Sequence, residues 1–152
     1  MASMTNRQAA EAIRAHHGEM ATALRERVAA LNRAVQARHE HLEQQRAVLD
    51  YLETELLPHA AAEEQALYPA GDDGLTALLV RSMRDEHLDL TARVAAFRDE
   101  RDPILAVALS SAILALFESH LHKENDLLIP ALAADASVSL AELLGGMHEL
   151  LG

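Results

Sequence analysis

Two stretches of eleven residues decide the fold of this chain: residues 59–69, HAAAEEQALYP, and residues 120–130, HLHKENDLLIP. Each begins with a histidine, has a glutamate four residues later and ends with a proline six residues after that glutamate. Because an α-helix turns once in about 3.6 residues, each histidine and its glutamate lie on the same face of a helix, one turn apart. The repeat therefore predicts two similar helical hairpins related by approximate twofold symmetry.

The composition around this repeat is typical of a helical protein. Of the 152 residues, 50% are hydrophobic, while glycine (6) and proline (4) are scarce. Chain breaks are expected near residues 36–41, at residues 71–74 and at Asp102-Pro103. The predicted helices are Thr5–Ala37, His41–Tyr68, Leu75–Glu100 and Pro103–Ala133, with a short fifth helix at Ser139–Leu151 capped by Ser137 or Ser139.

Each of the four long segments carries one apolar stripe at helical spacing, as Met20, Leu24 and Val28 do in the first. Short connections make consecutive helices antiparallel. The predicted fold class is therefore all-α, an up-down-up-down antiparallel four-helix bundle with a short C-terminal fifth helix. We expect a single domain over residues 1–152, since a chain of this length can bury one sufficient core.

Charge and cysteine content exclude several function classes. Lys and Arg number 13 against 24 Asp and Glu, and the net charge of −11 argues against nucleic acid, which requires a basic surface. The absence of cysteine excludes disulfides, iron–sulfur clusters, Cys-ligated zinc and a cysteine nucleophile. Neither a secretory signal nor an uninterrupted apolar run of about 18 residues is evident, so we expect a cytoplasmic protein without membrane contact.

Six ionisable residues interrupt the apolar stripes at core positions. His17 follows Ile13 by four residues and precedes Met20 by three. Buried carboxylates cost several kcal/mol each unless they are paired or bound to a metal, so something must compensate their charge. The six residues are His17, His59, Glu63, His87, His120 and Glu124.

All six lie at one level of the predicted bundle. At about 1.5 Å per residue, they lie ~8 to ~20 Å from the same end. A lone histidine on an apolar face is more often a hydrogen-bonded core residue, but six ionisable residues converging from four helices favour a shared site. Two bridging carboxylates and two histidines for each ion predict a two-metal centre, and imidazole and carboxylate suit iron, manganese or zinc.

The spaced pattern of these six residues, with EEQALYP from Glu63 and KENDLLIP around Glu124, resembles the hemerythrin-like (HHE) cation-binding domain family. The resemblance covers residues 5–134, nearly the whole chain. It implies a cofactor of two non-haem iron ions joined by an oxo or hydroxo bridge, with manganese or zinc as alternatives. In that arrangement Glu63 and Glu124 bridge the ions, and the terminal ligands are His17, His59, His87 and His120.

The chain departs from the oxygen-carrying hemerythrins at two positions. Where the carriers have a second histidine one turn after the third-helix ligand, this chain has Thr91. Its fourth-helix carboxylate is Glu124 rather than an aspartate at longer spacing. One metal therefore lacks an imidazole, and the candidates to replace it are Glu64, Glu86, Tyr51, Tyr68 and water. Glu64 and Glu86, each rotated about 100° from its neighbouring ligand, fit a supporting or surface position better.

Three hypotheses follow for the function. The first is redox chemistry at a di-iron centre that binds O2, H2O2 or NO, with catalase-like, peroxidase-like or oxidase activity left open. The second is an oxygen or iron sensor, or an iron reservoir, without turnover. The third is a buried salt-bridged network that holds no metal. The sequence leaves open the metal, the physiological substrate and the oligomeric state.

Overall fold

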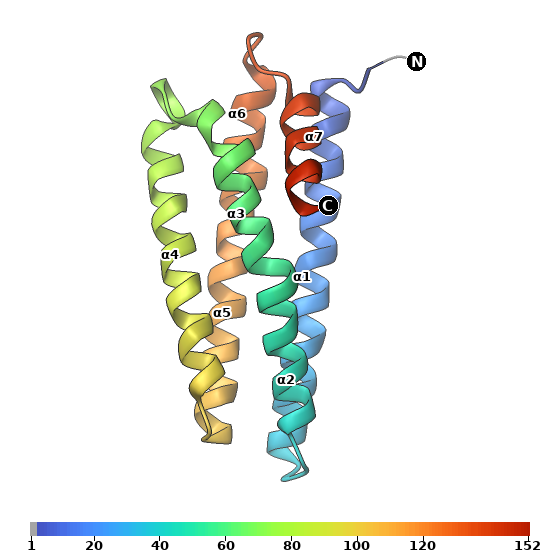
Figure 1. Ribbon diagram of the computed structural model, residues 1–152, viewed down its shortest axis with the longest axis vertical. Helices are drawn as coiled ribbons and strands as arrows, with labels where there is room; N and C mark the ends of the chain where they lie inside the picture. Colours follow the sequence, from blue (N-terminus) through green and yellow to red (C-terminus); the bar gives the residue numbers. More distant parts are fainter. Residues whose placement is uncertain (1–2) are drawn as a thin grey trace.

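The structure, a computed structural model, describes residues 3–152, and every regular element within them is helical. The predicted all-α class is confirmed. Figure 1 shows the helices side by side in a bundle of four rods, with α7 against one end. The helices are α1 (Asn6–Gln36), α2 (Leu42–Tyr51) continued by α3 (Leu57–Ala66), α4 (Ala77–Asp99), α5 (Pro103–Lys123) continued by α6 (Ile129–Ala134), and α7 (Leu140–Leu151).

Side-chain caps set three of the helix starts. Thr5 caps α1 by accepting from the Gln8 backbone N–H, and the Gln8 side chain accepts from the Thr5 backbone in return. Asp102 accepts from two backbone N–H groups at the start of α5. Ser139, one of the two predicted caps, accepts from the Glu142 backbone at the start of α7. These starts lie within one residue of the predicted ones, because Thr, Asp and Ser are residue types that commonly cap a helix and can be recognised in the sequence.

Two rods contain a wider, π-helical turn, η1 (Leu52–Leu56) and η4 (Glu124–Leu128). A proline follows each turn by two residues, Pro58 in α3 and Pro130 in α6. Proline has no N–H to donate, and its ring clashes with the carbonyl four residues back, so a local widening lets the helix continue. The predicted helix His41–Tyr68 therefore contains a π turn, and its last α-helical residue is Ala66 rather than Tyr68.

The chain leaves α3 after Ala66 and makes a short 3-10 turn, η2 (Tyr68–Gly71), and then another, η3 (Gly74–Thr76), before α4. Gly74 has a φ of 70°, a left-handed conformation that favours glycine. The early end of α3 rotates Tyr68 away from the position that a continued α-helix would give it.

The core is divided into two apolar clusters. Met20 and Leu90 belong to one cluster, and Ile13 and Met83 to the other. His17 lies between Ile13 and Met20 in sequence, and the third-helix histidine lies between Met83 and Leu90. The polar residues therefore form a layer between two apolar ones.

The two ends of the described chain are joined through one side chain. Asn6, in the first turn of α1, donates to the carbonyls of Ala133 (3.3 Å) and Val138 (2.9 Å). Its Oδ1 accepts from the backbone N–H of Leu140 at 2.9 Å. Asn6 thereby fixes the loop between α6 and α7 and sets where α7 starts.

One continuous helical segment, Pro103–Ala134, is long and apolar enough to cross a bilayer by length and composition alone, since an 18-residue window within it has a mean hydropathy of 1.8. In the structure this segment contacts α1 and α4, and Ile113 and Phe117 from it are buried in the core. Its apolar character therefore has an explanation within the bundle.

Candidate metal centre

All six residues predicted for the site lie together in the polar layer, and each is at most 5% exposed. They come from four rods of the bundle, since α1 gives one histidine, α3 a histidine and a glutamate, α4 a histidine, and the α5–η4 segment a histidine and a glutamate. Their ligand atoms form two groups. The groups are Glu63, His87, His120 and Glu124, and His17, His59 and Glu63.

The first group is compact. The Nε2 atoms of His87 and His120 lie 3.0 Å apart. Glu63 Oε1 lies 3.6 Å from His87 Nε2, and Glu124 Oε1 lies 3.4 Å from His120 Nε2. The four side chains thus direct two imidazole nitrogens and two carboxylate oxygens to one point.

The second group meets the other oxygens of the same two carboxylates. Glu63 Oε2 lies 3.4 Å from His59 Nε2 and 3.7 Å from His17 Nε2. Glu124 Oε2 lies 3.6 Å from His17 Nε2. Each carboxylate therefore presents one oxygen to each group, which is the arrangement that a bridging ligand requires.

Several of these atoms have no hydrogen-bond partner although they are buried. Within the described residues they include the Nε2 atoms of His17 and His59 and the Oε2 atoms of Glu63 and Glu124. Buried polar atoms without partners are costly and rare in folded proteins. Ligands of one ion at about 2.1 Å and about 90° to 110° lie about 3.0 to 3.4 Å from one another. The observed spacings are close to this range, so the residues fit a bound metal.

Tyr68 completes the first group. Its hydroxyl donates to Glu124 Oε1 at 2.8 Å and lies 3.2 Å from His87 Nε2 and 3.1 Å from His120 Nε2. The side chain is fully buried. Among the candidates for the missing imidazole, Tyr68 is the one whose polar atom lies within this group.

The other candidates lie elsewhere. Tyr51 donates to the Met20 carbonyl at 3.3 Å, outside the site. Thr91, at the position of the carriers' extra histidine, donates to the backbone carbonyl of His87 at 2.8 Å. Its hydroxyl is therefore used within α4 and takes no part in the ligand groups.

Three of the four histidines have a protein partner at their second nitrogen. His87 Nδ1 lies 2.9 Å from Glu64 Oε1, and His120 Nδ1 lies 3.4 Å from Glu86 Oε1. Glu86 also accepts from the Lys123 ammonium. With the proton on Nδ1, each histidine donates to its carboxylate and keeps Nε2 free for a metal. Of the supporting and surface positions expected for Glu64 and Glu86, these contacts fit the supporting one.

The partner of His17 was not predicted. His17 Nδ1 lies 2.7 Å from Asn125 Oδ1. The only sequence signal for this contact is that Asn125 directly follows Glu124. His59 differs from the other three, because its Nδ1 is buried and has no partner in the described residues.

The electrostatics of the cluster favour a bound cation. Burial and the negative charge of Glu63 raise the pKa of Glu124 to about 7. Burial also opposes the charge of His17, but the attraction of Glu63 and Glu124 outweighs it and raises the pKa of His17 to about 9. Without a metal, protons must therefore balance two buried carboxylates, and a bound cation takes over that role.

A comparison with protein families finds a match to the hemerythrin HHE cation binding domain over residues 8–132. The chain belongs to this family. The match includes every residue of the two ligand groups as well as Tyr68, whereas α7 lies beyond it. Comparisons with curated proteins and with solved structures found no match. The family and the buried His/Glu cluster together fit a metal-binding protein.

Proposed function

We propose that this chain is a non-haem di-iron protein that binds O2, peroxide or NO and that decomposes hydrogen peroxide or reactive nitrogen species. The observation that carries the proposal is the pair of ligand groups that share Glu63, with unpaired buried atoms directed into both. Imidazole and carboxylate donors suit iron, and a phenol oxygen is a further hard donor. Two irons held this close supply Lewis acidity and a two-electron redox change.

The ligand residues would be divided between two ions. His87, His120 and Tyr68 would hold the first ion, His17 and His59 would hold the second, and Glu63 and Glu124 would offer one oxygen to each. The first ion would then have a phenol oxygen where the oxygen carriers have an imidazole. Because Tyr68 also donates to Glu124 at 2.8 Å, its hydroxyl would hold a proton next to the carboxylate of the same group.

The fold supports this assignment. In the proposed site the four rods alternate in an up-down-up-down order, and each contributes ligand residues at the same level of the bundle. The apolar clusters on both sides of the polar layer keep bulk water from the site. A low-dielectric surrounding strengthens the interaction between the carboxylates and a cation.

Elemental analysis and the visible spectrum of freshly purified protein test the proposal. We expect about two irons per chain and an absorption band that shifts when azide or hydrogen peroxide is added. Oxygen evolution from peroxide in the same cuvette supports turnover, whereas its absence with intact iron binding favours a sensor or reservoir.

A matched pair of variants links the iron to the site. Glu63→Ala removes a ligand from both groups and should retain less than half of the wild-type iron. Glu43→Ala changes an exposed glutamate of α2 and should retain all of it. Metal-free wild-type protein that stays folded and takes up no iron would overturn the proposal.

A further inference from the structure

The two ligand groups differ in the residues that support their histidines. In the first group, both histidines have a carboxylate at the second nitrogen. His87 Nδ1 lies 2.9 Å from Glu64 Oε1, and His120 Nδ1 lies 3.4 Å from Glu86 Oε1. A carboxylate that accepts from an imidazole makes that imidazole a stronger metal ligand. The first group therefore has two strengthened histidines.

The histidines of the second group have weaker support. His17 Nδ1 lies 2.7 Å from the neutral amide oxygen of Asn125. His59 Nδ1 is buried and has no partner in the described residues. When His59 binds a metal through Nε2, its ring proton is on Nδ1, where it has no acceptor. Because such supporting partners contribute about 10- to 100-fold to metal affinity, the second group should hold an ion less tightly than the first.

The second group also lies beside open space. A hollow of about 410 Å³ between α1, η1, α3 and α7 is lined by His59 and also by Glu55 and Gln65, which are exposed. A neighbouring hollow of about 260 Å³ is lined by His17, His59 and Glu63. The larger hollow therefore leads from the surface of the molecule to His59.

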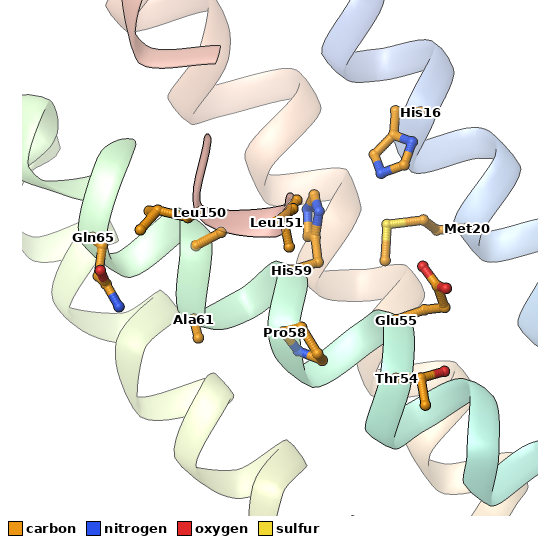
Figure 2. A pocket seen from close by; sticks show the side chains of 11 residues that line it. His16, Met20, Thr54, Glu55, Pro58, His59, Ala61, Gln65, Leu150 and Leu151 are labelled. Atoms are coloured by element: carbon orange, nitrogen blue, oxygen red, sulfur yellow. The ribbon is translucent and has the colours of Figure 1, made fainter. Parts of the chain in front are cut away.

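His59 is the least restrained of the four histidines, since the other three have a partner at Nδ1. Figure 2 shows its ring projecting from α3 beside Leu151, at the edge of the larger hollow. Imidazole is smaller than benzene, which a cavity of about 150 Å³ can hold. A hollow of about 410 Å³ is therefore large enough to admit the ring when it turns away from Glu63.

Another histidine, His16, lies next to His59 on the side of the hollow. The two ring centroids are 5.4 Å apart, and both residues line the hollow. The side chain of His16 is 54% exposed, and its Nδ1 lies 4.0 Å from Glu19 Oε2. Imidazole and carboxylate are donors that suit a divalent cation, so His16 can bind one between the solvent and His59.

We propose that the second group gains and loses its ion through the larger hollow. His59 turns aside to let the ion pass, and His16 binds the ion on the way. The first group, with His87 and His120, keeps its ion throughout. This inference rests on the proposed two-ion function and adds a route by which one of the two positions is filled and emptied. The ligand is a divalent cation such as Fe²⁺, and only bonds to the metal form or break.

Release of iron to the chelator ferrozine, measured without oxygen on Fe²⁺-loaded protein, tests the inference. We expect two phases of about one iron per chain each, with rates about 10- to 100-fold apart. Two substitutions reverse the kinds of support. Glu64→Gln gives His87 a neutral amide and should speed the slow phase alone, whereas Asn125→Asp gives His17 a carboxylate and should slow the fast phase alone. Release of both irons at one rate would overturn the inference.

Two matched pairs of variants test the route. Ala61→Trp places a large ring in the hollow from an exposed position of α3 and should slow the fast phase, whereas Ala47→Trp, exposed on α2, should not. His16→Ala should slow iron uptake about two- to tenfold without lowering the final iron content, and His39→Ala, exposed after α1, should change neither. Equal rates within both pairs would overturn the route.

The outcomes separate this inference from the proposed function. Zinc or manganese ions released in two unequal phases, from protein that takes up no iron, would refute the iron function and leave the unequal exchange intact. Two irons released together would do the reverse. Protein that takes up no metal at all would overturn both.

Discussion

Replacing Tyr68 by phenylalanine removes one oxygen atom from the centre of the proposed site. The ring remains and still fills its place in the apolar cluster, so the substitution tests the hydroxyl alone. That hydroxyl donates to Glu124 at 2.8 Å, and neither residue is exposed to solvent. A hydrogen bond to a charged group contributes about 1.5 to 3 kcal/mol, and Glu124 is charged above its pKa of about 7, so the comparison is made at pH 8.

For a chain of this length, 1 kcal/mol corresponds to about 2 to 4 °C in the midpoint of thermal unfolding. We therefore expect metal-free Tyr68→Phe to unfold about 3 to 12 °C below the wild type. Burial and the charges of Glu63 and Glu124 raise the pKa of Tyr68 in the metal-free protein, so the hydroxyl is protonated there and donates. Thermal unfolding followed by circular dichroism measures the difference.

The chain contains a matched control, because its second tyrosine, Tyr51, lies outside the site. The Tyr51 hydroxyl bonds weakly, at 3.3 Å, to one backbone carbonyl, so Tyr51→Phe should cost less than about 1 kcal/mol. In iron-loaded protein, Tyr68→Phe should also change the visible spectrum, whereas Tyr51→Phe should not. Equal midpoints and equal spectra for the two variants would refute the reasoning.

Three further predictions concern other parts of the molecule. Gly71→Ala puts a Cβ 2.8 Å from Val80 Cγ2 and should cost about 1 to 3 kcal/mol, while Gly145→Ala, with open space around it in α7, should stabilise by about 0.5 to 1 kcal/mol; denaturant unfolding compares the two. In metal-free protein, the raised pKa of His17 stabilises the fold below pH 6.5, and this contribution is lost as the pH rises to about 9, so the thermal midpoint should fall over that range. Asn125→Ala removes the partner of His17 and should weaken metal binding about 10- to 100-fold in a chelator competition; an unchanged affinity would contradict that role.

The residues of the polar layer were predictable because, in a regular α-helix, the number of residues between two positions sets the angle between their side chains. His17 follows Ile13 by one turn, and both are buried as the period requires. The same rule brought His59 and Glu63 to one face, since the π turn η1 lies before both of them. A π turn that precedes both residues does not change the angle between their side chains.

The rule failed where the backbone leaves the α-helix. Five residues after Glu63, Tyr68 would point about 140° away in a continued helix. It reaches the site because α3 ends at Ala66 and a 3-10 turn begins, and no sequence period records that change. Sequence spacing did not predict the hollow between α1, α3 and α7 either. That hollow depends on where α7 packs against α1 and α3, and these contacts join segments more than 70 residues apart.

The three hydrogen bonds of Asn6 also bear on how the molecule assembles during synthesis. Their partners lie up to 134 residues further along the chain, so these bonds cannot form until residue 140 has left the ribosome. Contacts of such long range form late, because the entropy of closing the loop is lost before the bonds form. The apolar faces of α1 to α6 can therefore pack early, whereas α7 docks only after these helices have been made. A nascent chain stopped before residue 140 would have the ligand residues but an open side toward His59.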